Sequence, residues 1–212
     1  MMTRNSLDIA VLLSGSGTTL QNLIDQIEQG RLDARIVGVI ASRAGAYGLE
    51  RARKHAIPTA TVLRKDFADT PTFSAAVWAQ IRAYDPELVV MAGFMSLLDV
   101  PDDFANRIVN VHPALIPAFC GKGMYGHHVH EAVLAYGAKI TGVTVHFANA
   151  HYDEGPIILQ AAVPVLEEDT PDSLADRVQT KEREVYPQAI QLIAEGRVAV
   201  EGRRVRIRQD ME

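Results

Sequence analysis

The residues best suited to chemistry in this chain lie in the stretch RIVNVHPALIP, residues 107–117. Side chains alternate between the two faces of a strand, so Asn110 and His112 point to one face and the valine between them to the other. Pro113 cannot donate to a strand ladder, which places the imidazole at the carboxyl end of the strand. Open α/β sheets bind their ligands at that edge. The pattern therefore predicts a site, although a strand with two polar residues satisfied by neighbouring loops is an open alternative.

Asp153 is the third candidate for chemistry. It lies in the loop ANAHYDEGP, residues 148–156, where an aspartate is usually a turn former. Its functional interpretation is a carboxylate that reaches His112, holds the ring and favours its charged form. The strand before the loop, TGVTVHF at 141–147, alternates cleanly and puts His146 on a polar face.

A glycine-rich turn near the start of the chain predicts a phosphate site. The apolar run IAVLLS, residues 9–14, breaks at Gly15, and a helical pattern begins at Thr18. The turn SGSGTT, residues 14–19, would present backbone N–H groups at the positive end of a helix. Leu20 occupies the third glycine position of the dinucleotide fingerprint, and no Gly-Lys-Ser/Thr follows, so a phosphate monoester fits better than NAD or ATP. The alternative is a glycine turn that only closes the corner.

The elements that must position these residues alternate between strand and helix. The second predicted strand ends at Ser42–Arg43, without an acidic residue for a ribose hydroxyl, which disfavours NAD; Arg43 leaves an NADP reductase as a distant rival. The other elements expected in this half are a helix at 47–55, a helix capped by Asp69 or Thr70 and ending near Tyr84, and strands at 34–42, 58–63 and 87–93.

The second half continues with a strand at 156–165, a long helix from Pro171 to Glu195 and a hairpin at 197–207. Glu182 falls within the apolar stripe of the helix, where a carboxylate must be paired, either with a buried arginine or with a cationic ligand. Pro187 should kink or divide the helix. The alternation of strands and helices predicts an α/β fold with a Rossmann-like, doubly wound and mostly parallel sheet. We expect one domain over 1–212, with a phosphate-binding half at about 1–106 and a catalytic half at about 107–212.

Histidines gather in the second half, so a metal site must be weighed. His128 and His130 are two apart in a glycine-rich loop, and Asp153 could add an oxygen ligand. No HExxH motif or cysteine-rich partner accompanies them, so we expect no metal.

Composition bounds the function further. The chain has 212 residues, a net charge of −5 and a pI near 5.8, which argues against a nucleic-acid or anionic-membrane surface and favours small-molecule partners. The single cysteine, Cys120, excludes an internal disulfide and suits a reducing compartment. The first apolar run is too short for a signal peptide or a membrane span, so we expect a cytoplasmic protein.

Several stretches together resemble the phosphoribosylglycinamide formyltransferases, a family of folate-dependent enzymes of purine synthesis. They are, in chain order, SGSGTTLQNLID, AGFM, NVHPALIP, GVTVHF, YDEGPIILQ and RVQTKEREVYP. The Asn-x-His-Pro stretch and the later Asp-x-Gly-Pro loop are shared by the wider formyltransferase family. The glycine-rich loop and the QTKE helix select the glycinamide ribonucleotide member.

The resemblance implies formyl transfer from 10-formyltetrahydrofolate to the primary amine of glycinamide ribonucleotide, with no metal. Asn110 and His112 would stabilise the oxyanion, and Asp153 would keep His112 protonated and assist proton transfer. The remaining implied contacts are the phosphate with Gly15, Gly17, Thr18 and Thr19, the ribose or ammonium end with Glu182, and the folate with Asn110, Met95, Ser96, Leu97 and Leu98. A homodimer is left open.

The chain departs from the family pattern at the expected folate-tail site. Bacterial members carry arginine where this chain has Ser96 and another near Thr70; Arg64 or Lys65 is expected to substitute. Many members also have asparagine at Thr19, and the loop at 119–130 is longer than in short-loop members. The rival functions are a formyltetrahydrofolate deformylase and a non-catalytic phosphate-ligand-binding module. Methionyl-tRNA formyltransferase is disfavoured because it would need a tRNA-binding domain and more positive charge.

Overall fold

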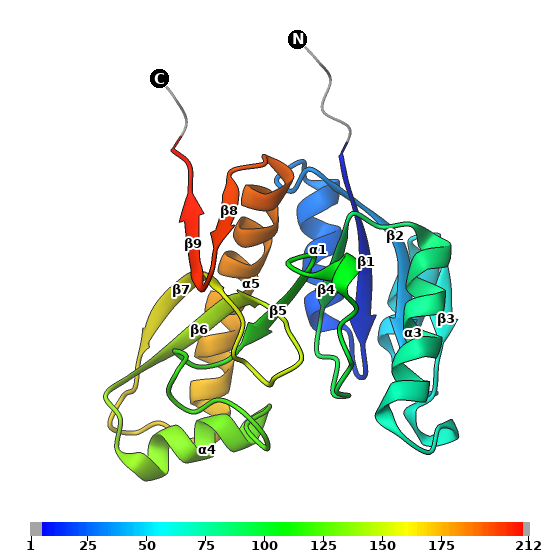
Figure 1. The fold of residues 1–212 in the computed structure, drawn as a ribbon. Helices are drawn as coiled ribbons and strands as arrows, with labels where there is room; N and C mark the ends of the chain where they lie inside the picture. Colours follow the sequence, from blue (N-terminus) through cyan, green and yellow to red (C-terminus); the bar gives the residue numbers. More distant parts are fainter. Residues whose placement is uncertain (1–5, 210–212) are drawn as a thin grey trace. The chain divides into compact units, whose positions relative to one another are not determined.

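A computed structural model describes residues 6–209, and this part of the chain divides after Val109 into two compact units. The first unit contains β1 (Leu7–Leu13), α1 (Thr18–Glu28), β2 (Ala34–Ala41), α2 (Gly48–Lys54), β3 (Thr59–Thr61), α3 (Thr70–Tyr84) and β4 (Leu88–Met91). Strand β5 (Ile108–His112) spans the division. The second unit contains α4 (His127–Tyr136), β6 (Ile140–Phe147), β7 (Ile157–Pro164), α5 (Pro171–Ala194), β8 (Val198–Glu201) and β9 (Arg204–Ile207) (Figure 1).

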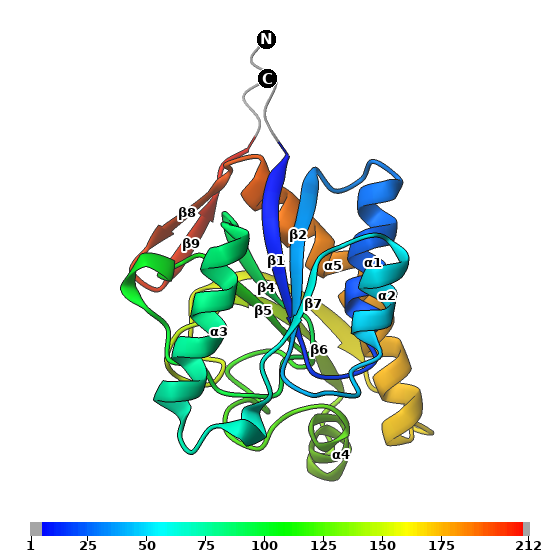
Figure 2. The ribbon, with the colours of Figure 1, turned by 90° about the vertical axis from the view of Figure 1, so that its right-hand side faces the viewer.

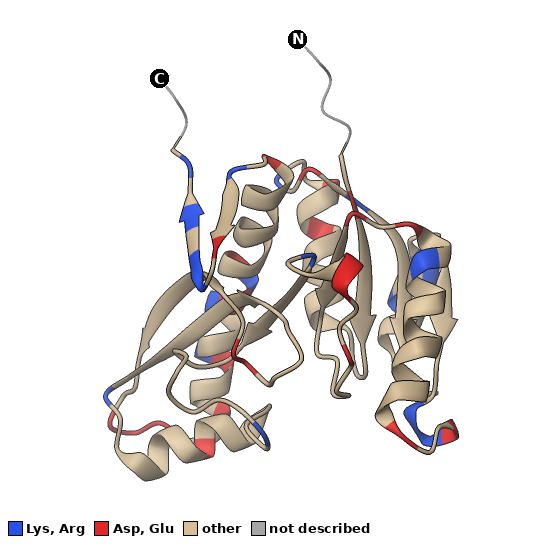
Figure 3. Ribbon diagram, viewed as in Figure 1, with Lys and Arg blue, Asp and Glu red and all other residues tan. Residues whose placement is uncertain are grey.

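Strand pairing gives a seven-stranded sheet in the order β3-β2-β1-β4-β5-β6-β7 and a separate β8-β9 pair. Strands β1, β2, β3 and β4 pair in parallel, whereas β6 and β7 are antiparallel. The predicted α/β class with a doubly wound, mostly parallel sheet is therefore confirmed. The predicted hairpin at 197–207 is confirmed as the antiparallel pair of β8 and β9, and Figure 3 shows basic residues along β9.

The first unit is layered around its parallel strands. Figure 2 shows α1 and α2 on one side of β1 and β2 and α3 on the other. Because both faces are covered, residues 9–13 of β1 are wholly buried and the strand has no polar alternation. On β2, Gly38 lets helix α3 approach closely: a Cβ there would lie 2.2 Å from the ring of Tyr84.

The carboxyl ends of the first unit's strands are joined by backbone hydrogen bonds. The N–H of Ser14 donates to the carbonyl of Gly93 at 3.0 Å, and the N–H of Ser42 donates to the carbonyl of Leu13 at 3.1 Å. These bonds bring together the loops that follow β1, β2 and β4. The glycine-rich turn thus lies at the sheet edge where ligands bind in open α/β folds.

The core of the second unit forms where α4 and α5 pack over β6 and β7. The fully buried side chains of this cluster include Val129, Val133, Val143, Leu174 and Val178. A reciprocal capping box starts α5: Ser173 N–H donates to the Thr170 hydroxyl at 3.2 Å, and Thr170 N–H donates to the Ser173 hydroxyl at 3.0 Å.

Two local expectations were wrong. His128 and His130 do not lie in a loop, because α4 begins at His127. Of the kink or division expected at Pro187, the division is wrong, because α5 runs unbroken from Pro171 to Ala194. On β6, the polar face that carries His146 is buried like the apolar face, since both sides of this strand are covered. No helix of the described residues is long and apolar enough to cross a membrane.

Candidate functional site

A pocket of about 210 Å³ lies over the glycine-rich turn of the first unit. Its lining comprises Ser14, Gly15, Ser16, Gly17, Thr18 and Thr19 from the turn, with Arg43, Ala92, Gly93 and Met95. Of these lining residues, Arg43 alone carries a charge, and its guanidinium makes no hydrogen bond or ion pair with any residue in 6–209. The sequence indicates Arg43 only as a ligand for an NADP 2′-phosphate. The structure places it beside the turn that is predicted to bind phosphate.

The start of α1 is suited to an anion. Gly17, its N-cap residue, has φ of 72°, and no side chain caps the helix. The first turn of α1 also contains no acidic residue. Backbone N–H groups in a first turn have no partner within the helix, and the macrodipole adds positive potential there. The turn therefore offers a phosphate both backbone donors and a favourable field.

The Ser14 hydroxyl connects this turn to the segment that follows β4. The backbone N–H of Met95 donates to Ser14 Oγ at 2.9 Å, and Ser14 Oγ lies 2.6 Å from the hydroxyl oxygen of Ser42. Both serines are buried. The backbone position of Met95, which the resemblance assigns to the folate, is therefore held by Ser14, the first residue of the glycine-rich turn.

The residues expected around the folate differ in accessibility. Met95 exposes 44% of its surface, Leu98 is buried, and Ser96 and Leu97 are half-buried. The guanidinium of Arg64 is already engaged: Nη1 donates to the carbonyl of Phe67 at 2.9 Å, and the group lies 5.5 Å from the ring centre of Phe73.

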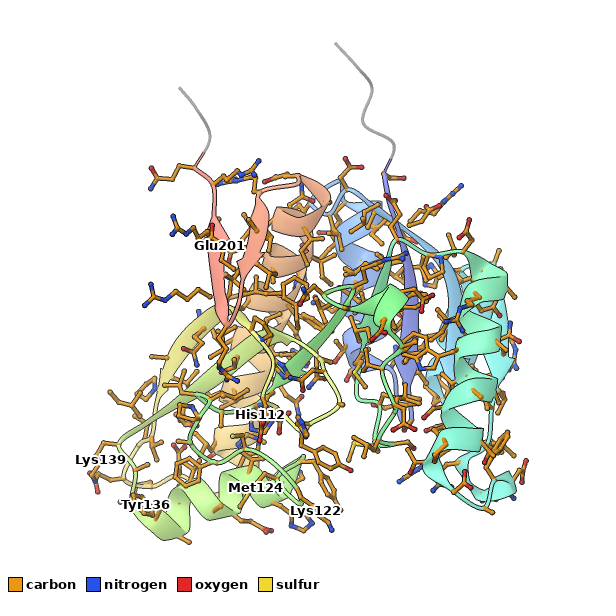
Figure 4. The ribbon with its side chains drawn as sticks, viewed as in Figure 1. His112, Lys122, Met124, Tyr136, Lys139 and Glu201 are labelled. Atoms are coloured by element: carbon orange, nitrogen blue, oxygen red, sulfur yellow. The ribbon has the colours of Figure 1, made fainter. Side chains whose placement is uncertain are left out.

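In the second unit, the end of β5 places His112 beside two oxygen atoms. Its Nδ1 lies 3.5 Å from Asp153 Oδ2, and its Nε2 donates to the carbonyl of Phe119 at 2.8 Å. His112 is 3% exposed, and Figure 4 shows it inside this unit, whereas Tyr136 and Lys139 lie at the surface. Both oxygens can only accept, so an imidazolium would satisfy both ring nitrogens.

Asp153 is held by the backbone, and no arginine or lysine within residues 6–209 pairs with it. Its φ is 56°, an uncommon conformation for a residue other than glycine, and the N–H of Gly121 donates to its Oδ2 at 2.9 Å. Its other oxygen, Oδ1, lies 3.7 Å from His146 Nε2. One carboxylate thus faces two histidines.

His146 contacts Asn110 and was not among the predicted site residues. Its Nδ1 donates to the carbonyl of Phe147 at 2.9 Å, and Asn110 Nδ2 donates to its Nε2 at 3.3 Å. His146 is 1% exposed, and burial lowers its pKa, although the Phe147 hydrogen bond and Asp153 oppose that shift. A neutral His146 leaves Nε2 as an acceptor and fixes the orientation of the Asn110 amide. The sequence did contain a signal for His146: the alternation of residues along β6 placed it on the face opposite the apolar side chains.

The other candidates in this unit are arranged differently. His130 is buried, and its Nδ1 has no hydrogen-bond partner in the described structure. Burial lowers the pKa of His130, with smaller contributions from His127 and His112. Glu182, expected at an inward position, is half-buried on α5. Within residues 6–209, no three His, Cys, Asp or Glu side chains are grouped as metal ligands.

The comparison with protein families decides the relationship. Residues 7–190 match the model described as formyl transferase. The chain belongs to the formyl transferase family. Among relatives, phosphoribosylglycinamide formyltransferase of Escherichia coli K12 is 37% identical over 194 residues, covering 91% of this chain and 89% of that protein.

Two further similar proteins show the extent of the match. The crystal structure of glycinamide ribonucleotide transformylase 1 from Symbiobacterium toebii aligns with a TM-score of 0.90 and 46% identity, covering 96% of this chain and 94% of that one. The trifunctional purine biosynthetic protein adenosine-3 of Gallus gallus is 38% identical over 198 residues. The match covers 92% of this chain but 19% of that longer relative, so the chain spans about a fifth of the trifunctional protein.

Proposed function

We propose that this chain transfers the formyl group of 10-formyltetrahydrofolate to the primary amine of glycinamide ribonucleotide. The products are formylglycinamide ribonucleotide and tetrahydrofolate, and the reaction belongs to purine biosynthesis. The likeness to phosphoribosylglycinamide formyltransferase over 91% of this chain and 89% of that protein carries the proposal. The two sites described above supply matching chemistry. The single cysteine fits a reducing compartment, and the cytoplasm stays a prediction.

The substrate's phosphate suits the pocket over residues 14–19. Backbone donors at the start of α1 and the guanidinium of Arg43 together provide hydrogen bonds and positive charge for a phosphate monoester. Arg43 is exposed, so its contribution should weaken as the salt concentration rises. Glu182 is assigned to the ribose or ammonium end of the same substrate.

Asn110 and His112 suit the oxygen that gains negative charge. When an amine attacks a formyl carbon, charge moves onto the formyl oxygen, and each preorganised donor to such an oxygen lowers the barrier by roughly 3–4 kcal/mol. Asn110 uses one of its two amide hydrogens on His146, which leaves the other for the substrate. Because His146 fixes the amide, the donor needs little reorganisation during the reaction.

His112 cannot serve this oxygen while its Nε2 donates to the Phe119 carbonyl. The formyl oxygen must therefore take the place of that carbonyl beside Nε2. Phe119 has a φ of 49°, which is strained for a bulky residue, so the segment has an energetic reason to change conformation when substrate binds. Asp153 keeps Nδ1 facing a carboxylate in either arrangement.

Proton transfer is assigned to the pair of His112 and Asp153. The attacking amine must lose a proton and the departing folate nitrogen must gain one. A positioned acid or base contributes about 10²–10⁴-fold to the rate. With Nδ1 at 3.5 Å from Oδ2, the pair is positioned to hold a proton and pass it on.

The folate, which supplies the formyl group, fits the segment of residues 95–98. The exposed thioether of Met95 offers apolar contact, and its backbone is fixed by Ser14. Arg64 is a weaker candidate for the anionic tail than the sequence indicated, because Phe67 and Phe73 already hold its guanidinium. Lys65, which is exposed, is the better assignment.

The proposal is tested by mixing the protein with 10-formyltetrahydrofolate, with and without glycinamide ribonucleotide. The release of tetrahydrofolate is followed by absorbance, and the ribonucleotide product is identified by its mass. We expect release only with the ribonucleotide present, together with a product heavier by one formyl group. Release without it would indicate a deformylase, and no release would favour the binding module.

A further inference from the structure

The beginning of α2 holds two successive carbonyl groups of the phosphate turn. The N–H of Gly48 donates to the carbonyl of Gly15 at 3.1 Å, and Nε of Arg51 donates to the carbonyl of Ser16 at 2.9 Å. Neither Gly48 nor Arg51 lines the pocket. Both therefore contact the turn from outside the predicted anion site.

The direction of these carbonyls sets the direction of the turn's donors. In a trans peptide the C=O and the following N–H point in opposite directions. Since the carbonyls of Gly15 and Ser16 point toward α2, the N–H groups of Ser16 and Gly17 point away from it. Successive N–H groups that face the same side form a concavity that binds anions.

Arg51 is itself fixed at three points. Besides donating to Ser16, it donates from Nη1 to Gln21 Oε1 at 3.3 Å, and its guanidinium lies 5.1 Å from the ring centre of Tyr47. Gln21 belongs to α1, so the guanidinium joins the turn, α1 and α2. Only a planar group with several donors makes this set of contacts, which distinguishes arginine from lysine.

The close approach of α2 to the turn supports this arrangement. A Cβ added to Gly17 would lie 2.5 Å from the Cα of Gly48, so the two backbones are in contact there. Because Gly17 and Gly48 have no Cβ, α2 comes close enough for Arg51, one helical turn further along, to reach the Ser16 carbonyl.

From these contacts we propose that Arg51 is a positioning residue for phosphate binding, acting through the Ser16 carbonyl and not by touching the substrate. The inference rests on the proposed function, because the ligand is the phosphate of glycinamide ribonucleotide. Arg51 aligns the turn's N–H groups before the phosphate arrives. Its loss should therefore weaken the affinity for the phosphate-bearing substrate and leave the chemistry of Asn110, His112 and Asp153 unchanged.

The test compares Arg51→Met with Arg53→Met. Arg53 lies on the same helix, is exposed and pairs with Glu50, so its loss removes the same charge without touching the turn. The quantities are the KM for glycinamide ribonucleotide, the KM for 10-formyltetrahydrofolate, kcat, and the inhibition constant of inorganic phosphate. For Arg51→Met we expect a roughly tenfold rise in the ribonucleotide KM and the phosphate constant, with kcat and the folate KM retained.

Arg51→Lys separates positioning from charge. Lysine keeps the positive charge but lacks the planar set of donors, so we expect it to restore only part of the lost affinity. Full restoration by lysine would overturn the proposal in favour of a simple charge effect. Equal KM values for Arg51→Met and Arg53→Met would overturn it as well. If the Arg51→Met protein does not fold, Arg51→Lys still measures how far phosphate affinity depends on the guanidinium.

A binding measurement keeps this inference separate from the proposed function. Inorganic phosphate is titrated into the wild-type protein and the variants, and its binding is followed by calorimetry. Suppose that the wild-type protein binds phosphate and that Arg51→Met weakens this binding, but that no formyl transfer occurs. The proposed function then fails and the inference stands. If transfer occurs and phosphate binds the Arg51→Met and Arg53→Met proteins equally, the inference fails alone.

Discussion

Asp153 connects several of the groups that the proposed mechanism uses. Its Oδ2 accepts the N–H of Gly121 at 2.9 Å and lies 3.5 Å from His112 Nδ1, while its Oδ1 lies 3.7 Å from His146 Nε2. The loop position, held at a φ of 56°, brings the carboxylate to both rings. The charge of this carboxylate, more than its shape, should matter for catalysis.

Changing Asp153 to Asn tests that statement. The amide keeps the volume and can still accept from Gly121, but it lacks the negative charge beside His112. We expect kcat to fall by about 10²–10⁴-fold with little change in either KM, as measured by steady-state kinetics. Asp176→Asn, at an exposed position on α5, is the matched control. Equal kcat values for the two variants would remove the Asp153–His112 pair from the mechanism.

The buried histidines predict how stability depends on pH. Burial lowers the pKa of both His130 and His146 from the ordinary value of 6.5. Below pH 6.5 the unfolded chain binds protons at these positions while the folded chain resists them, so the free energy of unfolding should fall as the pH falls. Well above pH 6.5 both histidines are neutral in the folded and in the unfolded chain, so their full contribution to the free energy of unfolding is present there.

Urea unfolding at a series of pH values from 7.5 to 5 measures this effect. The His146→Gln protein should lose less stability over that range than the wild-type protein. His151→Gln, which changes an exposed histidine, should retain the wild-type slope. If His146→Gln and the wild-type protein had the same slope, the account of His146 as a neutral acceptor for Asn110 would be wrong.

At the residue scale, the sequence predicted that Asn110 and His112 lie together but not all of their hydrogen-bond partners. Alternation along β5 was enough to put Asn110 and His112 on one face, because their spacing fixes it. The contact from Asn110 to His146 joins two strands and depends on register, which one strand's pattern does not contain. The bond from His112 to the Phe119 carbonyl likewise depends on how the chain folds back after Pro113.

The turn between β1 and α1 depends on one glycine more than on its neighbours. Gly17 combines a φ of 72° with a close approach to Gly48, where a Cβ would lie 2.5 Å from the Cα. An alanine would have to adopt a left-handed conformation and displace backbone. The turn cannot accept it without moving either its own N–H groups or α2.

Gly17→Ala should therefore lower stability and phosphate affinity together. The left-handed strain costs about 1–2 kcal/mol, and the steric contact adds about 1–3 kcal/mol. Chemical denaturation measures the loss, and inorganic phosphate reports the affinity. Gly45→Ala is the control, since a Cβ there meets nothing within 4 Å and its φ is ordinary. Similar stability in both variants would show that the turn can relax freely.

At the element scale, the first residue of a helix was predictable where a capping side chain precedes the periodic apolar pattern. Asp69 caps α3 by accepting from the N–H of Thr72 at 2.9 Å, which resolves the choice between Asp69 and Thr70. The start of α4 had no such signal, because Gly126 precedes it and no side chain caps it. Pro187 was expected to kink or divide α5, yet the helix is undivided, with buried residues on both sides of the proline that pack it against the sheet.

At the scale of the whole molecule, charge and function have to be reconciled. The chain carries a net charge of −5, yet the proposed substrate is an anion. The positive potential must therefore be local. In the first unit it comes from Arg43 on the pocket, Arg51 behind the turn and the start of α1. The overall composition favoured a small-molecule ligand, in line with the proposed substrate, but it did not locate the site.

The most direct test of the proposed function compares three reactions of the wild-type protein with 10-formyltetrahydrofolate. The acceptor is glycinamide ribonucleotide, its phosphate-free riboside, or none. We expect rapid formyl transfer to the ribonucleotide, transfer to the riboside with a much higher KM but a similar kcat, and no folate turnover without an acceptor. Equal KM values for ribonucleotide and riboside would contradict the phosphate turn. Turnover without an acceptor would contradict the assignment of a transferase.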